Sequence, residues 1–159
     1  MERQTAVPLH YISRFEFCGL VQYILLKYPQ DVNAQGRDYG TALHVAIAMG
    51  HAEASKLLLA HCVDVDVRGT KNRTPLHLAS ERGYVDIGRQ LLDRNADVYA
   101  QDNNHSTRLH LALSQQNIKT AKLLIECGAN AYVWNNSGET PLHFASKRGY
   151  HGALQLLLD

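Results

Sequence analysis

Apolar side chains recur along the chain at two fixed places in a repeating unit, with polar stretches between them. Small residues stand 33 positions apart, at Ala46, Ala79, Ala112 and Ala145. Aliphatic pairs recur at the same interval, at Leu58-Leu59, Leu91-Leu92, Leu124-Ile125 and Leu157-Leu158. A fixed period of this length predicts stacked supersecondary units rather than one globular core.

Each unit is predicted to contain two short helices and a polar loop. In the third unit Thr74 is a favoured helix cap, and the following proline suits the first helical position. Gly83 ends this helix, and a second helix is expected over about Tyr84–Asp93. An extended stretch and a polar turn, residues 96–104, then lead to the next unit. Helices this short are not stable alone, so the units must stabilise one another by packing.

A tetrad that begins with threonine and ends with histidine marks the start of each unit. Its copies are Thr41-Ala42-Leu43-His44, Thr74-Pro75-Leu76-His77, Thr107-Arg108-Leu109-His110 and Thr140-Pro141-Leu142-His143. A looser copy, Val7-Pro8-Leu9-His10, precedes them by 34 residues. The repeats are therefore expected at about 3–35, 36–68, 69–101, 102–134 and 135–159, the last one incomplete, within a single domain 1–159.

Some units depart from the pattern. Arg108 replaces proline, and Gln116 stands where the other inter-helix turns have glycine, which predicts a strained or differently shaped turn in the fourth unit. Cys62 occupies the place where Asn95 and Gly128 are expected to end their helices in a left-handed conformation.

Both ends also diverge, as terminal repeats do when they cap a stack. The first unit has Phe15, Phe17 and Cys18 where small residues and glycine are expected, and one extra residue whose place the sequence leaves open. The last unit stops at Asp159 without a loop. We expect the chain to be a fragment of a longer protein; the alternative is a C-terminal helix that serves as its own cap.

The period and its motifs resemble the ankyrin-repeat family. The motifs are Thr74-Pro75-Leu76-His77-Leu78-Ala79, Gly50-His51, Leu57-Leu58-Leu59 and Asp31-Val32-Asn33-Ala34. The resemblance implies an all-α solenoid of helix-turn-helix units with short β-hairpin or turn loops. It also implies a non-enzymatic module that binds partner proteins on a concave face of loop tips and first helices. Residues 64–77 are similar, in addition, to ankyrin arrays attached to NACHT-type sensor proteins of mushroom-forming fungi.

Composition adds few constraints. The formal net charge is +1, which predicts no strong overall attraction to nucleic acid. No apolar run approaches the ~20 residues that span a bilayer, so no membrane segment is expected. The three cysteines are odd in number and no signal sequence precedes them, so we expect free thiols in the cytoplasm or nucleus.

Histidine is the candidate for site chemistry, since five of the nine histidines end a tetrad. A metal ladder is one interpretation. However, successive helix pairs lie about 10 Å apart, too far for two such imidazoles to share one zinc ion with bonds of about 2 Å. We expect instead a structural hydrogen bond from each histidine to loop backbone and to the threonine hydroxyl, with no metal and no cofactor.

Catalytic motifs are lacking. The sequence contains no nucleophile elbow, P-loop or glycine-rich dinucleotide turn, and no close acid pair in an apolar setting. We therefore expect no enzymatic activity.

Loop tips and exposed first-helix positions are the expected binding residues, because nothing in the stack requires them to be large or charged. The basic ones are Arg37, Arg68, Lys71, Arg73, Arg82, Lys147 and Arg148, and the acidic ones are Asp38, Glu81 and Glu139. This excess of four positive charges suggests an acidic or phosphorylated partner segment, against the alternative of a solvated mixed-charge surface.

Uncharged candidates complete this predicted surface. They are Tyr39, Gln101, Gln115 and Trp134. Tyr99 and Tyr132, 33 residues apart, are expected to pack between neighbouring loops, whereas Trp134 is expected to contact a partner.

The leading hypothesis is a monomeric scaffold or sensor module that binds another protein. The alternatives are a free-standing inhibitor or adaptor, and binding of nucleic acid or lipid headgroups through the basic tips. Steep salt dependence would distinguish polyanion binding.

Overall fold

A computed structural model describes residues 6–36, 40–61 and 63–158. These residues form ten α-helices: α1 (Ala6–Arg14), α2 (Cys18–Lys27), α3 (Ala42–Met49), α4 (Ala52–Leu59), α5 (Pro75–Arg82), α6 (Val85–Leu92), α7 (Arg108–Ser114), α8 (Ile118–Glu126), α9 (Pro141–Lys147) and α10 (His151–Leu158). Two 3-10 turns, η1 (Pro29–Asp31) and η2 (Thr70–Asn72), lie in loops.

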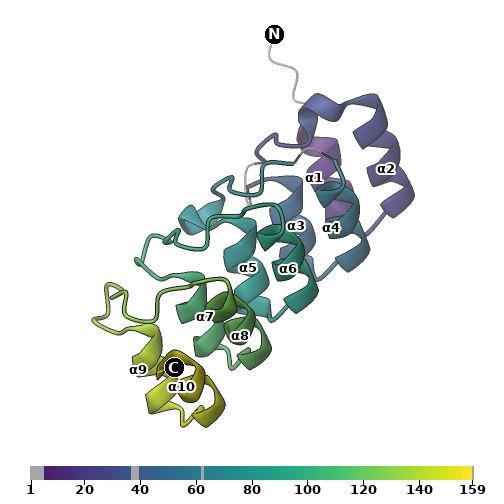
Figure 1. The fold of residues 1–159 in the computed structure, drawn as a ribbon. Helices are drawn as coiled ribbons and strands as arrows, with labels where there is room; N and C mark the ends of the chain where they lie inside the picture. The colour runs from purple at the N-terminus through teal and green to yellow at the C-terminus, as the bar shows by residue number, and fades with distance from the viewer. Residues whose placement is uncertain (1–5, 37–39, 62, 159) are drawn as a thin grey trace.

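The helices pair and the pairs stack in chain order (Figure 1). The first helices α1, α3, α5, α7 and α9 each contact the next one, and the second helices α2, α4, α6, α8 and α10 do the same. The loops project from one side of the stack (Figure 1). This confirms the predicted all-α solenoid. The described residues contain no strand, only an isolated bridge between Gly36 and Gly40, so these loops are turns rather than extended hairpins.

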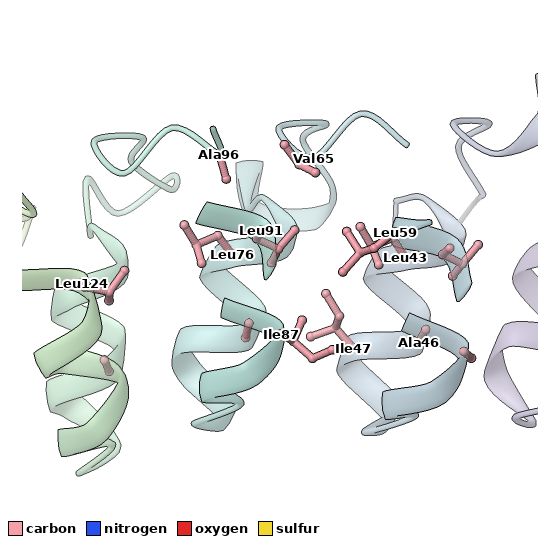
Figure 2. Close-up of a cluster of buried hydrophobic side chains, with 14 of the residues drawn as sticks. Leu43, Ala46, Ile47, Leu59, Val65, Leu76, Ile87, Leu91, Ala96 and Leu124 are labelled. Atoms are coloured by element: carbon pink, nitrogen blue, oxygen red, sulfur yellow. The ribbon is translucent and has the colours of Figure 1, made fainter. Parts of the chain in front are cut away.

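A single apolar core runs through the stack. Leu43, Leu76 and Leu109, from three successive tetrads, are fully buried, as are Ala46, Ala79 and Ala112. Figure 2 shows how side chains of neighbouring helix pairs meet, with Ile47 of α3 close to Ile87 of α6. The small residues on the first helices allow close approach, and the second helices contribute the leucines that fill the space between pairs.

The inter-helix turns require a left-handed backbone conformation, which explains why glycine recurs in them. Gly50, Gly83 and Gly149 adopt φ values of 81°, 76° and 66°. Gln116 adopts φ 63° at the same place, which confirms that the fourth turn carries strain that a side chain does not favour.

The left-handed residues expected after the second helices are also present, since Asn95 and Gly128 both have positive φ. Cys62 lies outside the described residues.

The first unit accommodates its extra residue after α2. Glu16, with φ 56°, is the residue at the place of Gly50, so the numbering offset from the second unit is still 34 at this turn. Helix α2 has ten residues, whereas α4 has eight, and η1 follows it. The offset is 33 again at Val32, which is buried like Val65. The insertion therefore lengthens the end of α2 and the turn at Pro29.

Candidate interaction surface

The loop tips share one backbone closure. A backbone N–H donates to the carbonyl four residues later in each described loop: Gly36 to Gly40, Gly69 to Arg73, Asp102 to Ser106 and Asn135 to Glu139, at 2.7–3.0 Å. Asn72, His105 and Gly138, 33 residues apart, are all left-handed at these tips. The side chains of Asp102 and Asn135 each accept two more backbone N–H groups inside their loops. These bonds hold the third, fourth and fifth tips in similar shapes.

Neighbouring tips also bond to each other. The Asn103 N–H donates to the Lys71 carbonyl at 3.0 Å, and the Asn136 N–H donates to the Asn104 carbonyl at 2.9 Å. Arg68 donates to the carbonyls of Asn72 and Gln101, which are 3.1 and 2.9 Å from its Nη1. The loops therefore form a laddered platform rather than independent fingers.

The tetrad histidines connect each helix pair to the next loop. In the second unit Nδ1 of His44 accepts the Thr41 N–H at 3.2 Å and lies 2.9 Å from the Thr41 hydroxyl. Because Nδ1 is an acceptor, Nε2 carries the proton and donates to the Arg73 carbonyl at 3.0 Å. His110 repeats the arrangement with Thr107 and with the Glu139 carbonyl at 3.1 Å.

The predicted bonds to the threonine and to loop backbone are both present at His44 and His110. His10 Nε2 lies against the Gly40 carbonyl and accepts the Gly36 N–H at 2.9 Å. Thr74–His77 and Thr140–His143 form the same local bond at Nδ1, and each threonine caps its helix.

His77 is the most strongly perturbed member of the series. Burial, followed by the charges of Arg108, Arg68 and Arg73, lowers its pKa to about 2. The Ser106 backbone opposes this shift only weakly, because Nε2 of His77 has no partner in hydrogen-bond geometry among the described residues. Burial also lowers the pKa of His44 and His110. These imidazoles are neutral structural groups at physiological pH.

Arg108 causes part of this perturbation. It is 0% exposed at the first position of α7, where the third and fifth repeats have proline. Its guanidinium donates to the Ala100 carbonyl at 3.1 Å and to the Thr74 hydroxyl at 3.2 Å, while Nε has no partner among the described residues. Burial lowers the pKa of Arg108 to about 10, against the opposing effects of Asp97 and Asp66. Arg108 thus connects the third and fourth repeats as a buried cation.

Arg73, predicted to contact a partner, is engaged within the stack. Its Nε lies 3.2 Å from Asp102 Oδ2, and its Nη1 lies 3.0 Å from both Glu81 carboxylate oxygens. Asp102 is buried and Glu81 is half-buried. The sequence analysis did not single out Asp102. This residue is equivalent to Gly69 and Asn135, each of which closes its own loop through its N–H. Two predicted surface residues, Arg73 and Glu81, are therefore engaged with Asp102 in ion pairs inside the stack.

The other predicted residues fall into three groups. The exposed ones are Arg68, Lys71, Arg82, Gln115, Trp134, Lys147 and Arg148. Gln101 and Glu139 are half-buried, and Lys147 lies 3.5 Å from Glu139. Arg37, Asp38 and Tyr39 lie outside the described residues. We call the seven exposed residues the front face; they come from the loop tips and from α5, α7 and α9 or their C-terminal ends.

Aromatic side chains differ in their settings. Trp134 is 60% exposed, and its ring centroid lies 5.2 Å from that of His143. Tyr99 and Tyr132 are also mostly exposed, although Tyr99 Oη approaches Gly128 in the next unit. Packing between loops therefore covers these two tyrosines only in part.

Two searches of the described residues were negative. No three His, Cys, Asp or Glu side chains come together there as potential metal ligands. None of the described helices combines the length and the apolar character that crossing a membrane requires.

Comparison with known proteins agrees with this geometry. A family model described as ankyrin repeats (3 copies) matches residues 9–102 and 90–159. The search of curated proteins found no match. The matched ranges cover most of the sequence, and they contain the stacked helix pairs, the capped tetrads and the laddered loops. The chain therefore belongs to the ankyrin-repeat family, whose repeats generally mediate protein–protein interaction.

Proposed function

We propose that this chain is a non-enzymatic interaction module that binds a partner protein through the front face. The observation that carries the proposal is the contrast between a uniform scaffold and variable exposed residues. The tetrads and backbone closures repeat at 33-residue intervals, whereas Arg68, Gln101 and Trp134 occupy one equivalent loop position with three different side chains. A preorganised platform lowers the entropy cost of binding, and an exposed tryptophan is a frequent interface anchor.

The charges of the front face favour an acidic or phosphorylated partner segment. Among the described residues, Lys71, Arg82 and Arg148 form no ion pair, whereas Arg73 is paired with two carboxylates. The positive excess therefore persists when Arg73 and Glu81 are left out, and it lies on the exposed basic residues of the front face. Such charges would steer an anionic segment and set its register more than they would raise affinity.

Affinity capture from a cell extract tests the choice of face. The double variant Trp134→Ala/Arg82→Glu should lose captured proteins by about tenfold or more, since hot-spot residues each contribute about 1–2 kcal/mol or more. The matched control Arg89→Glu/Lys119→Glu reverses two exposed charges on α6 and α8 and should retain them. Equal capture by both variants, with unchanged melting temperatures, would reject the front face.

The salt dependence of binding distinguishes polyanion binding from protein recognition. Each phosphate neutralised adds about −0.9 to the log–log slope of affinity against salt. A shallow slope supports a protein partner. A slope of several units, with nucleic acid or lipid in the captured material, supports the polyanion alternative instead.

A further inference from the structure

The outer side of the first helix pair exposes large apolar side chains. Tyr11, Phe17, Leu20 and Tyr23 are between 45% and 62% exposed. The ring of Phe15 joins the first two, with centroids 5.0 Å from Tyr11 and 6.1 Å from Phe17. These residues lie on α1, on α2 and in the turn between them, at one end of the stack (Figure 1). We call the four residues Tyr11, Phe17, Leu20 and Tyr23 the N-terminal face.

This patch is comparable in size to the largest apolar patch of a typical soluble monomer, which is often a binding site. A phenylalanine or tyrosine side chain buries about 150–250 Å², so the three half-exposed rings alone contribute roughly 300 Å². Contiguous apolar patches of several hundred Å² mark interaction sites on soluble proteins, and terminal repeats usually have a polar outer side. The sequence analysis treated this unit as a cap. Its exposed side chains are large and apolar, whereas the outer side of a cap is usually polar.

The position equivalent to Leu20 is buried in every later helix pair. The position of Leu20 is held by Ala54, Ile87, Thr120 and Ala153, all at most 4% exposed. In those pairs the position is covered by the rest of the stack. In the first pair nothing among the described residues covers it to that extent.

Contacts at the position equivalent to Phe17 show which part of the preceding repeat the later repeats pack against. At the place of Phe17, Tyr84 brings its hydroxyl against Gly50, and Asn117 donates to the carbonyls of Ser80 and Glu81. These partners lie in the inter-helix turn of the preceding pair or in the last turn of its first helix.

The other two positions also face the preceding pair. At the place of Tyr23, Leu123 lies against Gly88 of α6. At the place of Tyr11, Phe144 meets the ring of His110 edge-on at 6.0 Å. The N-terminal face is therefore built like the side of each repeat that packs on the repeat before it.

We propose that the N-terminal face binds a helix pair of this same repeat type, stacked on α1 and α2 as each pair in the chain stacks on the next. The internal contacts define its chemistry. The bound helix pair offers a recessed inter-helix turn to Phe17, a small residue on its second helix to Tyr23, and a tetrad histidine to Tyr11. This surface is separate from the front face and does not depend on the proposed function.

A second copy of the chain fits less well when the same face meets itself. Phe17 would then meet an aromatic ring, whereas its equivalents meet a recessed turn. Tyr23 would likewise meet another large side chain, whereas its equivalent meets Gly88.

The test adds two helix pairs ahead of the full chain. The side of these pairs that contacts the following repeat is known from the structure. A copy of residues 69–134 is placed directly ahead of residue 2, which preserves the 33-residue spacing of the tetrads. In the chain itself residue 134 precedes a unit with Phe144 and Tyr150 at the places of Tyr11 and Phe17. The copy also retains Thr74, to which Arg108 is bonded.

Docking should raise the melting temperature and slow amide hydrogen exchange in α2 by tenfold or more. Leu20→Asp and Tyr23→Asp should remove most of both gains in the extended chain and change the unextended chain little. The matched control Leu26→Asp should keep the gains, because Leu26 is 70% exposed and the equivalent Ala60, Asp93 and Glu126 are exposed too.

Two results would overturn the proposal. One is an extended chain in which neither the melting temperature nor the α2 exchange rate differs from that of the unextended chain. The other is a dimer of the unextended chain, detected by light scattering, that Tyr23→Asp dissociates, since the occupant would then be a second copy. A monomer together with slowed α2 exchange supports the stacked helix pair.

Discussion

At the scale of single residues, Arg108 shows how one substitution changes the joint between two repeats. Helices α5 and α9 begin with Pro75 and Pro141, which are buried and need no hydrogen-bond partner. Arg108 is buried at the same place but carries a charge that only a carbonyl and a hydroxyl stabilise directly. Burying a cation without a contacting carboxylate costs free energy that an apolar residue does not.

Arg108→Pro is therefore expected to raise the free energy of unfolding by about 1 kcal/mol, since proline suits the first helical position and removes a desolvated charge. Denaturant unfolding measures the change. Arg108→Ala is the matched control and should be less stable than the proline variant, because it removes the same bonds without restricting the backbone. A loss above about 1 kcal/mol in the proline variant would mean that the bonds of Arg108 outweigh its desolvation.

His77 predicts a pH dependence of stability. Its folded pKa, about 2, lies below the ordinary value of 6.5, so below pH 6.5 the unfolded chain binds a proton that the folded chain excludes. Stability should therefore be complete above pH 6.5 and fall as the pH decreases. The loss from His77 is about 2 kcal/mol at pH 5.

The lowered pKa values of His44 and His110 act in the same direction. Unfolding curves between pH 7 and pH 5 check this, and His77→Gln should flatten the profile by about one proton. A profile of unchanged slope in that variant would contradict the assignment.

Residue-level features differed in how far the sequence could predict them. The bond between each tetrad threonine and histidine was predictable, because the two residues stand three positions apart, within one helical turn. The pairing of Arg73 with Asp102 was not, because 29 residues separate them and only the stack brings them together. Counting Arg73 among the binding residues followed from treating each loop alone.

At the scale of elements, the turn between α7 and α8 differs most clearly from its equivalents. Gln116 adopts the left-handed conformation that glycine adopts in three other turns. Asn117 then donates to the preceding turn at 3.0 and 2.8 Å, which fixes the position of α8. The strain was predictable from the sequence, whereas this compensating contact was not.

Gln116→Gly should stabilise the protein by about 1 kcal/mol, because glycine has no Cβ clash at positive φ. Thermal unfolding compares it with the control Lys122→Gly, which places glycine at an exposed position inside α8 and should cost about 1 kcal/mol. Destabilisation by both changes would indicate that Gln116 makes a contact that offsets its strain.

The ion pairs of Arg73 hold the third and fourth loops together. Arg73→Gln should lower the free energy of unfolding by about 1–3 kcal/mol, because it leaves the buried Asp102 carboxylate with only backbone donors. Lys71→Gln, on the same loop but exposed, should change it by less than about 0.5 kcal/mol. Equal effects of the two changes would mean that the ion pairs add no net stability.

At the scale of the whole molecule, the sequence predicted the architecture and the structure changed the surfaces. The 33-residue spacing was sufficient for the order and pairing of the helices, because every repeat contacts only its neighbours. Arg73 was counted among the binding residues, whereas in the structure its guanidinium pairs with a buried carboxylate. The N-terminal face was missed because exposure of Leu20 and Tyr23 depends on whether a helix pair covers them, which periodicity alone does not reveal.

The central claim is that the front face binds the partner, and hydrogen exchange of the bound complex tests it most directly. With a captured partner added, amide exchange should slow in loop residues 68–73, 101–106 and 134–139 and in the exposed turns of α5, α7 and α9. Exchange in α6 and α8 should stay unchanged. Protection confined to α6 and α8, with the loop tips exchanging as in the free chain, would contradict the account.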